Sequence, residues 1–133
     1  MKKFTKPKIF DSNVVVIGAG SAGLVSSLIV TSAKGKVVLI EKDKMGGDCL
    51  HRGCIPSKSL IRSSRVMSYI KRANEFGIDT TPGEINFVKI MDRVKAIIKT
   101  IEPHDSIERF TSLGVECVKG EAKIESPFLV SVN

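Results

Sequence analysis

Apolar and polar positions near the start of the chain predict a β-α-β unit. The run Val14-Val15-Val16-Ile17 is continuous and β-branched, as in a strand that is covered on both faces. Apolar residues then recur at helical spacing from Leu24 to about Ala33, and Gly35 ends that helix. A second apolar run at 37–40 predicts another strand, which closes with Glu41. Because the crossover of such a unit is right-handed, we expect the two strands to be parallel neighbours.

Two long helices are expected in the middle of the chain. The first runs from about Pro56 to Ala73. The second runs from Phe87 to Ile101, where apolar residues at steps of three and four place one stripe on the core. Pro103 should kink or restart this helix, because proline lacks the backbone N–H that a helix interior needs.

The last part of the chain reads as strands. Val115-Glu116-Cys117-Val118 predicts a third strand. Residues 122–124 and 128–132 predict the start of a small antiparallel unit with its turn at Ser126-Pro127. The chain as a whole is therefore expected to be an α/β protein with a parallel sheet and a long helical crossover.

A glycine fingerprint joins the first strand to the first helix. Gly18 permits the tight turn, Gly20 lets a pyrophosphate approach the backbone, and Gly23 lets the helix pack close to the strand. Phosphate is favoured at such a helix start by the N–H groups and the helix dipole. Glu41, 21 residues after Gly20, can accept hydrogen bonds from both hydroxyls of an adenosine ribose. The pattern favours a dinucleotide-binding site, and the alternative is a parallel β-α-β unit whose glycine turns bind no ligand. By itself the pattern does not distinguish FAD from NAD.

Cys49 and Cys54 form the second motif. In a regular helix, Cα atoms five residues apart lie about 8–9 Å from each other, beyond the ~7 Å limit for a disulfide. Gly53 and Pro56 allow a distorted turn in which the two sulfurs can meet. A disulfide that closes so short a loop adds little stability to the fold. A redox-active disulfide, reversibly reduced and oxidised, is therefore the favoured interpretation. The start of the following helix and Lys58 should both favour the thiolate of Cys54.

The other cysteine and the histidines do not support a metal site. Zinc would need two more ligands at short spacing, and Cys117, His51 and His104 offer no paired spacing. We expect Cys117 to be a small core residue, His51 to face solvent, and His104 to have a surface or capping role.

Composition narrows the class of protein. The net charge of +7 is spread along the 133 residues, and one Tyr with no Trp gives little for stacking on bases, so a nucleic acid partner is disfavoured. We expect instead that these basic residues form a solvated surface, or a surface that faces other parts of a larger protein. No apolar run approaches the ~20 residues of a membrane helix. The basic residues 1–11 read as a lead-in without a signal-type apolar stretch, so a cytoplasmic location is expected.

The run Gly46–Lys58 resembles the active-site signature of the pyridine nucleotide–disulfide oxidoreductases, and the resemblance extends from Val14 to Val132. The stretches 46–49 and 101–106 are most similar to mercuric reductase-like members, with dihydrolipoamide dehydrogenase-like members next, and Asp48 stands where many relatives have threonine. The resemblance implies a three-layer, Rossmann-like FAD-binding domain over residues 12–133. That domain is expected to be incomplete, without the family's NAD-binding and dimerisation domains.

The resemblance also implies the site residues. Cys54 would be the thiolate stacked against the flavin, and Cys49 the interchange thiol that attacks the substrate. Lys58 would lie near the reactive ring nitrogen, and the backbone at Ala122 would touch adenine. The implied cofactor-binding residues are Gly18, Gly20, Ser21, Ala22, Gly23, Glu41, Lys42, Gly47, Asp48, Cys49, Lys58 and Ala122.

The implied activity is electron transfer from NAD(P)H through FAD and the Cys49–Cys54 bridge to a small disulfide or a mercuric ion. The full-length protein is expected to be a homodimer, and the 133-residue chain is expected not to turn over alone. A strand missing beside the first strand would leave an apolar sheet edge that invites pairing with another copy. A non-catalytic dinucleotide-binding module and a dihydrolipoamide dehydrogenase fragment remain as alternatives.

Overall fold

The computed structural model describes residues 4–133, so residues 1–3 of the predicted lead-in lie outside the described residues. The chain divides into two compact units. The first unit holds the residues up to Gly47 together with Glu102–Asn133, and the second unit holds Asp48–Ile101. The predicted division into a lead-in and one partial FAD-binding domain stays a prediction.

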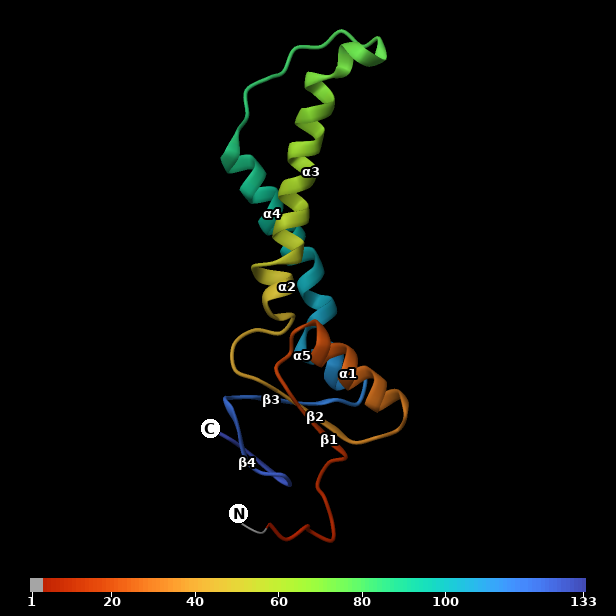
Figure 1. The fold of residues 1–133 in the computed structure, drawn as a ribbon, viewed down its shortest axis with the longest axis vertical. Helices are drawn as coiled ribbons and strands as arrows, with labels where there is room; N and C mark the ends of the chain where they lie inside the picture. The colour runs from red at the N-terminus through yellow and green to blue at the C-terminus, as the bar shows by residue number, and fades with distance from the viewer. Residues whose placement is uncertain (1–3) are drawn as a thin grey trace. The chain divides into compact units, whose positions relative to one another are not determined.

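The first unit contains the predicted parallel sheet. Its strand order is β1-β2-β3, with both pairs parallel and Leu39 in register with Val16 on one side and Cys117 on the other. Helices α1 and α5 lie on one side of this sheet and the β4-β5 hairpin on the other (Figure 1). The elements are β1 (Val14–Ile17), α1 (Ser21–Ser32), β2 (Val37–Glu41), α5 (Ile107–Ser112), β3 (Glu116–Lys119), β4 (Ala122–Ser126) and β5 (Leu129–Val132). The α/β fold class is confirmed, with small shifts at the ends of the predicted elements.

The core of the first unit lies on the helical face of the sheet. Leu24 of α1, Leu39 of β2 and Phe110 of α5 are buried together, with Val37 and Val115 beside them. Full burial of a side chain of this size stabilises a fold by about 1.5–3 kcal/mol. The core therefore fixes α1 against the strands and holds the turn between β1 and α1 in place.

The expectation that Val14–Ile17 is covered on both faces is wrong. Val14, Val15 and Ile17 are 38%, 39% and 49% exposed, whereas Val37 and Leu39 of β2 are almost fully buried. The reason is the strand order, because β2 is central and β1 is an edge strand in the sheet of the described residues. An apolar edge of this kind is what the sequence predicts, and its pairing with another copy stays a prediction.

The second unit is helical. Helix α4 returns alongside α3 (Figure 1). Arg93 Nη1 of α4 donates a hydrogen bond to the carbonyl oxygen of Ser59 over 3.2 Å. Val94 of the α4 stripe is 2% exposed, but Phe87 at its start is 64% exposed, so the predicted burial of the whole stripe is wrong there. The elements are α2 (Gly47–His51, which begins at the last residue of the first unit), α3 (Cys54–Lys71), η1 (Ala73–Phe76) and α4 (Phe87–Ile101).

Pro103 has the predicted effect on the chain. Helix α4 ends at Ile101, the 3-10 helix η2 spans Glu102–Asp105, and α5 restarts after Ser106, whose side chain accepts a hydrogen bond from Arg109 N–H. Between residues 4 and 133, no helix is both long enough and apolar enough to cross a membrane.

Candidate functional site

The turn from β1 to α1 forms an open cradle at the carboxyl end of the sheet. Gly18 adopts φ +95° and donates its N–H to Ile40 O over 2.8 Å, which ties the turn to β2. Gly20 is the extended N-cap residue of α1, and no side chain of residues 4–133 caps this helix. The first N–H groups of an α-helix have no partner within the helix, so this start is suited to an anion.

Gly23 and Gly20 differ in what surrounds them. A Cβ atom on Gly23 would lie 1.9 Å from the carbonyl oxygen of Gly18, so helix and strand approach too closely for any side chain. At Gly20, no atom of the described chain lies within 4 Å of the equivalent position. The lack of a side chain at Gly23 thus serves packing, and at Gly20 it leaves space beside the backbone.

Glu41 closes the cradle from the end of β2. Its Oε2 accepts a hydrogen bond from Ala19 N–H over 2.6 Å, and its Oε1 accepts one from Asp43 N–H over 2.7 Å. These two bonds fix the half-buried carboxylate and leave acceptor capacity on both oxygens. Sequence reasoning missed this pair of donors, since a backbone N–H leaves no signal in the sequence.

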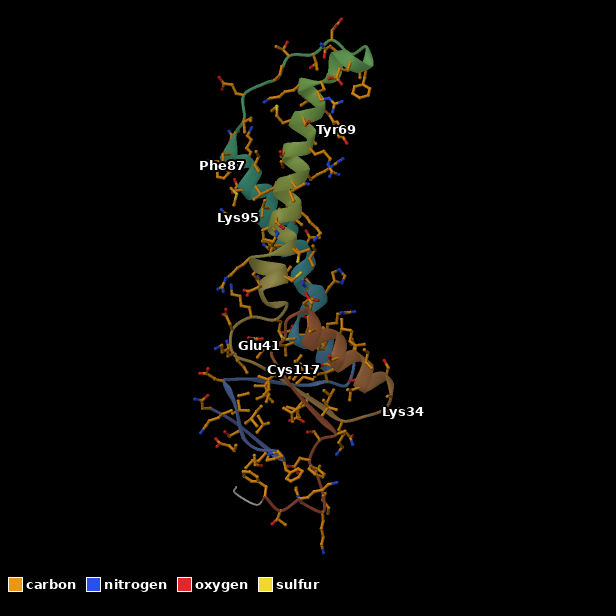
Figure 2. All side chains as sticks on the ribbon, in the orientation of Figure 1. Lys34, Glu41, Tyr69, Phe87, Lys95 and Cys117 are labelled. Carbon is orange, nitrogen blue, oxygen red and sulfur yellow. The ribbon has the colours of Figure 1, made fainter. Side chains whose placement is uncertain are left out.

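Glu41 of β2 and Cys117 of β3, both labelled in Figure 2, are among the residues that line a small cavity of about 80 Å³. Nearby, Lys42 and Glu121 form an ion pair at 3.4 Å, but both side chains are well exposed, so the pair contributes less than about 1 kcal/mol. Ala122 is half-buried at the start of β4. Thus Glu41, Lys42 and Ala122, all predicted for the cofactor, belong to the first unit.

The loop that leads to the cysteines packs on the cradle. Gly46 donates its N–H to Ala19 O over 2.9 Å. Gly47 has φ +57°, and a Cβ there would lie 2.8 Å from the Cα of Gly20. A side chain at 47 would therefore push the loop off the cradle, which explains a glycine at this position.

The helical path breaks between the two cysteines. Helix α2 ends at His51 and α3 begins at Cys54, with Gly53 as N-cap at φ −113° and ψ −106°. A Cβ on Gly53 would lie 3.0 Å from Asp48 O, so the turn is tight. Cys49 and Cys54 are thiols joined by a hydrogen bond. The predicted distorted turn, in which the two sulfurs meet, is confirmed.

The expectation that the charge of Lys58 favours the thiolate of Cys54 is borne out, but Lys58 is not the largest influence on this thiol. The pKa of Cys54 is raised above its usual value, first by the hydrogen bond with Cys49 and then by the negative charge of Cys49. The charge of Lys58 lowers this pKa but does not outweigh the neighbouring sulfur. Because each sulfur affects the charge of the other, the two thiols titrate as a coupled pair.

Removal of the Lys58 charge should raise the pKa of Cys54 further. We expect Lys58→Met to shift the pH profile of iodoacetamide modification at Cys54 to higher pH, because the cation favours the thiolate. Peptide mass mapping after timed alkylation across a pH series measures this profile. Lys71→Met, at the other end of α3, is the control and should leave it in place. If the pH profile of Cys54 modification in Lys58→Met is unchanged or shifts to lower pH, the Lys58 charge does not favour the Cys54 thiolate.

The remaining singled-out residues have minor roles. Cys117 packs against the core cluster, and burial raises the pKa of its thiol, as expected of a small core residue. His104 is exposed, in agreement with a surface role. His51 is half-buried in α2, so the expectation that it faces solvent is only partly met.

Comparison with known proteins identifies the family. The family model of the pyridine nucleotide-disulphide oxidoreductases matches residues 12–127. This chain belongs to that family. The resemblance seen in the Gly46–Lys58 signature is thereby confirmed.

Several curated members of the pyridine nucleotide-disulphide oxidoreductases are similar to this chain. The dihydrolipoyl dehydrogenase of Bacillus subtilis (strain 168) is 40% identical over 88 residues, which cover 66% of this chain and 19% of that protein. The dihydrolipoyl dehydrogenase of Acholeplasma laidlawii is 32% identical over 125 residues, covering 92% and 37%. The mercuric reductase of Bacillus cereus is 26% identical over 124 residues, covering 93% and 20%. This family member thus spans about a fifth of the length of the first of these relatives.

Proposed function

We propose that this family member provides the FAD-binding and dithiol part of an NAD(P)H-dependent disulfide oxidoreductase. The observation that carries the proposal is the meeting of Cys49 and Cys54 across the helix break at Gly53, a few residues after the Gly46-Gly47 loop that packs on the glycine cradle. Two thiols so placed can exchange a disulfide bond with a substrate. Bound FAD would supply the two-electron chemistry that links NAD(P)H to the cysteine pair.

The residues of the first unit fit the adenosine and pyrophosphate portion of FAD. The space at Gly20 and the uncapped start of α1, at Ser21 and Ala22, suit a pyrophosphate. Glu41 retains acceptor capacity for the ribose hydroxyls, and Lys42 and Ala122 are assigned to the same cofactor by the family resemblance. For the flavin end, that resemblance assigns Gly47, Asp48, Cys49 and Lys58.

The family resemblance assigns the first attack on the substrate to Cys49. The Cys49–Cys54 disulfide accepts two electrons and two protons and becomes the dithiol. The Cys49 thiolate then attacks one sulfur of a substrate disulfide, forms a mixed disulfide and releases the first thiol. Cys54 attacks the sulfur of Cys49, which restores the Cys49–Cys54 bond and releases the second thiol.

We propose a small-molecule disulfide as the substrate. The names of similar relatives support this choice, since dihydrolipoyl dehydrogenases reach 40% and 32% identity. A mercuric ion is the second candidate, supported by the relative named mercuric reductase, which matches 93% of this chain. For the full-length protein we propose a homodimer, on the strength of the family resemblance, and a cytoplasmic location, as expected from the sequence.

The Gly20→Ala variant tests the cofactor assignment. Alanine fits the backbone of Gly20 and meets no atom of the described chain, so folding should be unchanged. Its methyl group would fill the space assigned to the pyrophosphate and should weaken FAD binding on the order of 100-fold, as an overpacked site does. Quenching of flavin fluorescence measures the affinity, with Gly83→Ala as the matched control. No FAD binding by the wild type, or equal affinity in Gly20→Ala, would contradict the proposal.

A further inference from the structure

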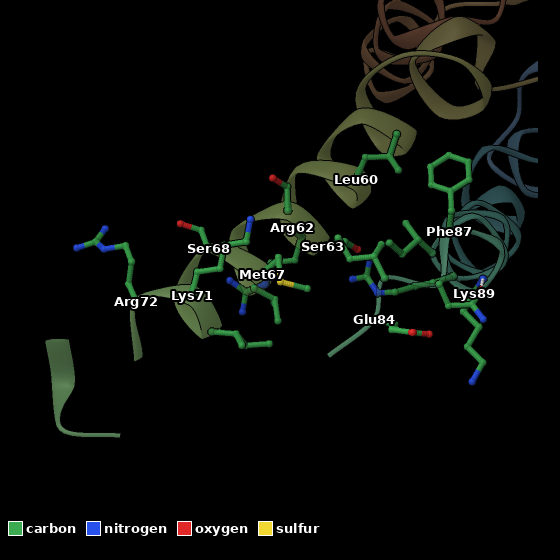
Figure 3. Close-up of a pocket in the computed structure, with 17 residues that line it drawn as sticks. Leu60, Arg62, Ser63, Met67, Ser68, Lys71, Arg72, Glu84, Phe87 and Lys89 are labelled. Atoms are coloured by element: carbon green, nitrogen blue, oxygen red, sulfur yellow. Dashed lines mark hydrogen bonds between the residues drawn. The ribbon is translucent and has the colours of Figure 1, made fainter. Parts of the chain in front are cut away.

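The second unit carries an open apolar groove that the disulfide chemistry does not use. It has a volume of about 1040 Å³ and lies between the later turns of α3 and the 84–93 segment (Figure 3). Met67 of α3 points into the space between these two walls (Figure 3). On the opposite wall, Ile85 and Phe87 are 62% and 64% exposed. Large apolar side chains gathered on one concave surface mark an interaction site.

The rim of this groove is cationic. Its described lining includes one carboxylate, Glu84, and five cations, which are Arg62, Lys71, Arg72, Lys89 and Arg93. Arg72 is paired with Glu75, and Arg93 is bonded to Ser59 O. The surrounding unit is also basic, since residues 48–101 hold ten lysines and arginines against five aspartates and glutamates, a net charge of +5 out of the chain's +7.

Apolar walls with a basic rim define the chemistry of the occupant. A second copy docked in the same way would bring like charges together, which is unfavourable. A nucleic acid would satisfy the cations but leave the apolar walls without a partner, because its affinity comes mainly from phosphate contacts. An amphipathic helix places an apolar stripe in such a groove and sets acidic side chains against the rim.

We propose that this groove docks an acidic amphipathic helix of another protein. Leucine-like side chains of that helix occupy the space around Met67 and Phe87. Its flanking carboxylates face Lys71, in the last turn of α3, and Lys89, in the first turn of α4. The assignment is independent of the cofactor site, so it can fail while the proposed oxidoreductase function stands.

The test uses the full chain and a labelled synthetic peptide of about 18 residues with leucine at positions i, i+3, i+4 and i+7 and glutamate on both flanks. Fluorescence anisotropy measures the affinity. Lys71→Glu/Lys89→Glu should weaken binding by about tenfold or more, because two attractive contacts become repulsive. Phe87→Ser should weaken it roughly fivefold or more through loss of an apolar anchor.

Two variants outside the groove serve as matched controls. Arg65→Glu/Lys99→Glu makes the same change in net charge on exposed positions, and Ile61→Ser removes a 56% exposed apolar side chain. Both should bind the peptide within about twofold of the wild type. The proposal is overturned if these controls lose as much affinity as the groove variants or if the groove variants bind normally. It is also overturned if a lysine version of the peptide, a DNA duplex or a second copy of the chain binds more tightly than the acidic peptide.

Discussion

The Gly23→Ala variant is expected to lose most of the stability of the first unit. The added methyl carbon would lie 1.9 Å from Gly18 O and 3.2 Å from Val16 Cγ1, and neither group is the flexible end of a long side chain. Relief of the clash requires α1 to move off β1, which opens the core around Leu24. Overpacking usually costs about 1–3 kcal/mol, and a clash with fixed backbone belongs at the upper end or beyond. That is a large share of the ~5–15 kcal/mol that stabilises a typical domain.

Urea denaturation followed by circular dichroism measures this loss. Gly83→Ala is the control, because Gly83 has no atom of the described chain within 4 Å of its added Cβ. We expect a fall of about 3 kcal/mol or more in the free energy of unfolding for Gly23→Ala, and a change below about 0.5 kcal/mol for the control. A Gly23→Ala protein as stable as the control would show that helix and strand do not approach as closely as the structure places them.

Cys49→Ser and Cys54→Ser should each abolish reversible oxidation of the chain. The hydrogen-bonded pair is the arrangement from which a short-loop disulfide can form, whereas Cys117 is half-buried in the other unit. In buffers of reduced and oxidised glutathione, the wild type should lose two free thiols as the redox potential rises. Neither serine variant should form an intrachain disulfide. In the proposed full-length oxidoreductase, either change should lower turnover at least about 1000-fold, as loss of a nucleophile does.

Thiol counting and peptide mapping of the oxidised chain show which cysteines pair. Cys117→Ala is the control, and it should retain the full two-thiol change. Oxidation that joins Cys117 to either partner, or a Cys54→Ser variant that still titrates as a two-thiol couple, would contradict the assignment of Cys49 and Cys54 as the redox pair.

Local sequence signals were sufficient for much of the fold. The β-branched runs at 14–17 and 37–40 mark β1 and β2, and helical periodicity marks α1 and α4. The break at Gly53 was also predictable, because residues five apart in a regular helix cannot bring two sulfurs together.

Features that depend on neighbours in space were not predictable. The exposure of β1 follows from the strand order, which periodicity does not contain. The raised pKa of Cys54 follows from the contact with Cys49, whereas sequence spacing pointed to Lys58 and the helix start. Phe87 fits a buried stripe by its spacing, yet it lines an open groove.

We propose that bound FAD and the Cys49–Cys54 pair exchange electrons. The most direct test of this exchange is the visible absorption spectrum of the chain after mixing with FAD, gel filtration and stepwise anaerobic reduction with dithionite. We expect retained flavin and a long-wavelength band at partial reduction that is absent in Cys54→Ser. Flavin that is lost on the column, or a band that persists unchanged in Cys54→Ser, would contradict the proposal.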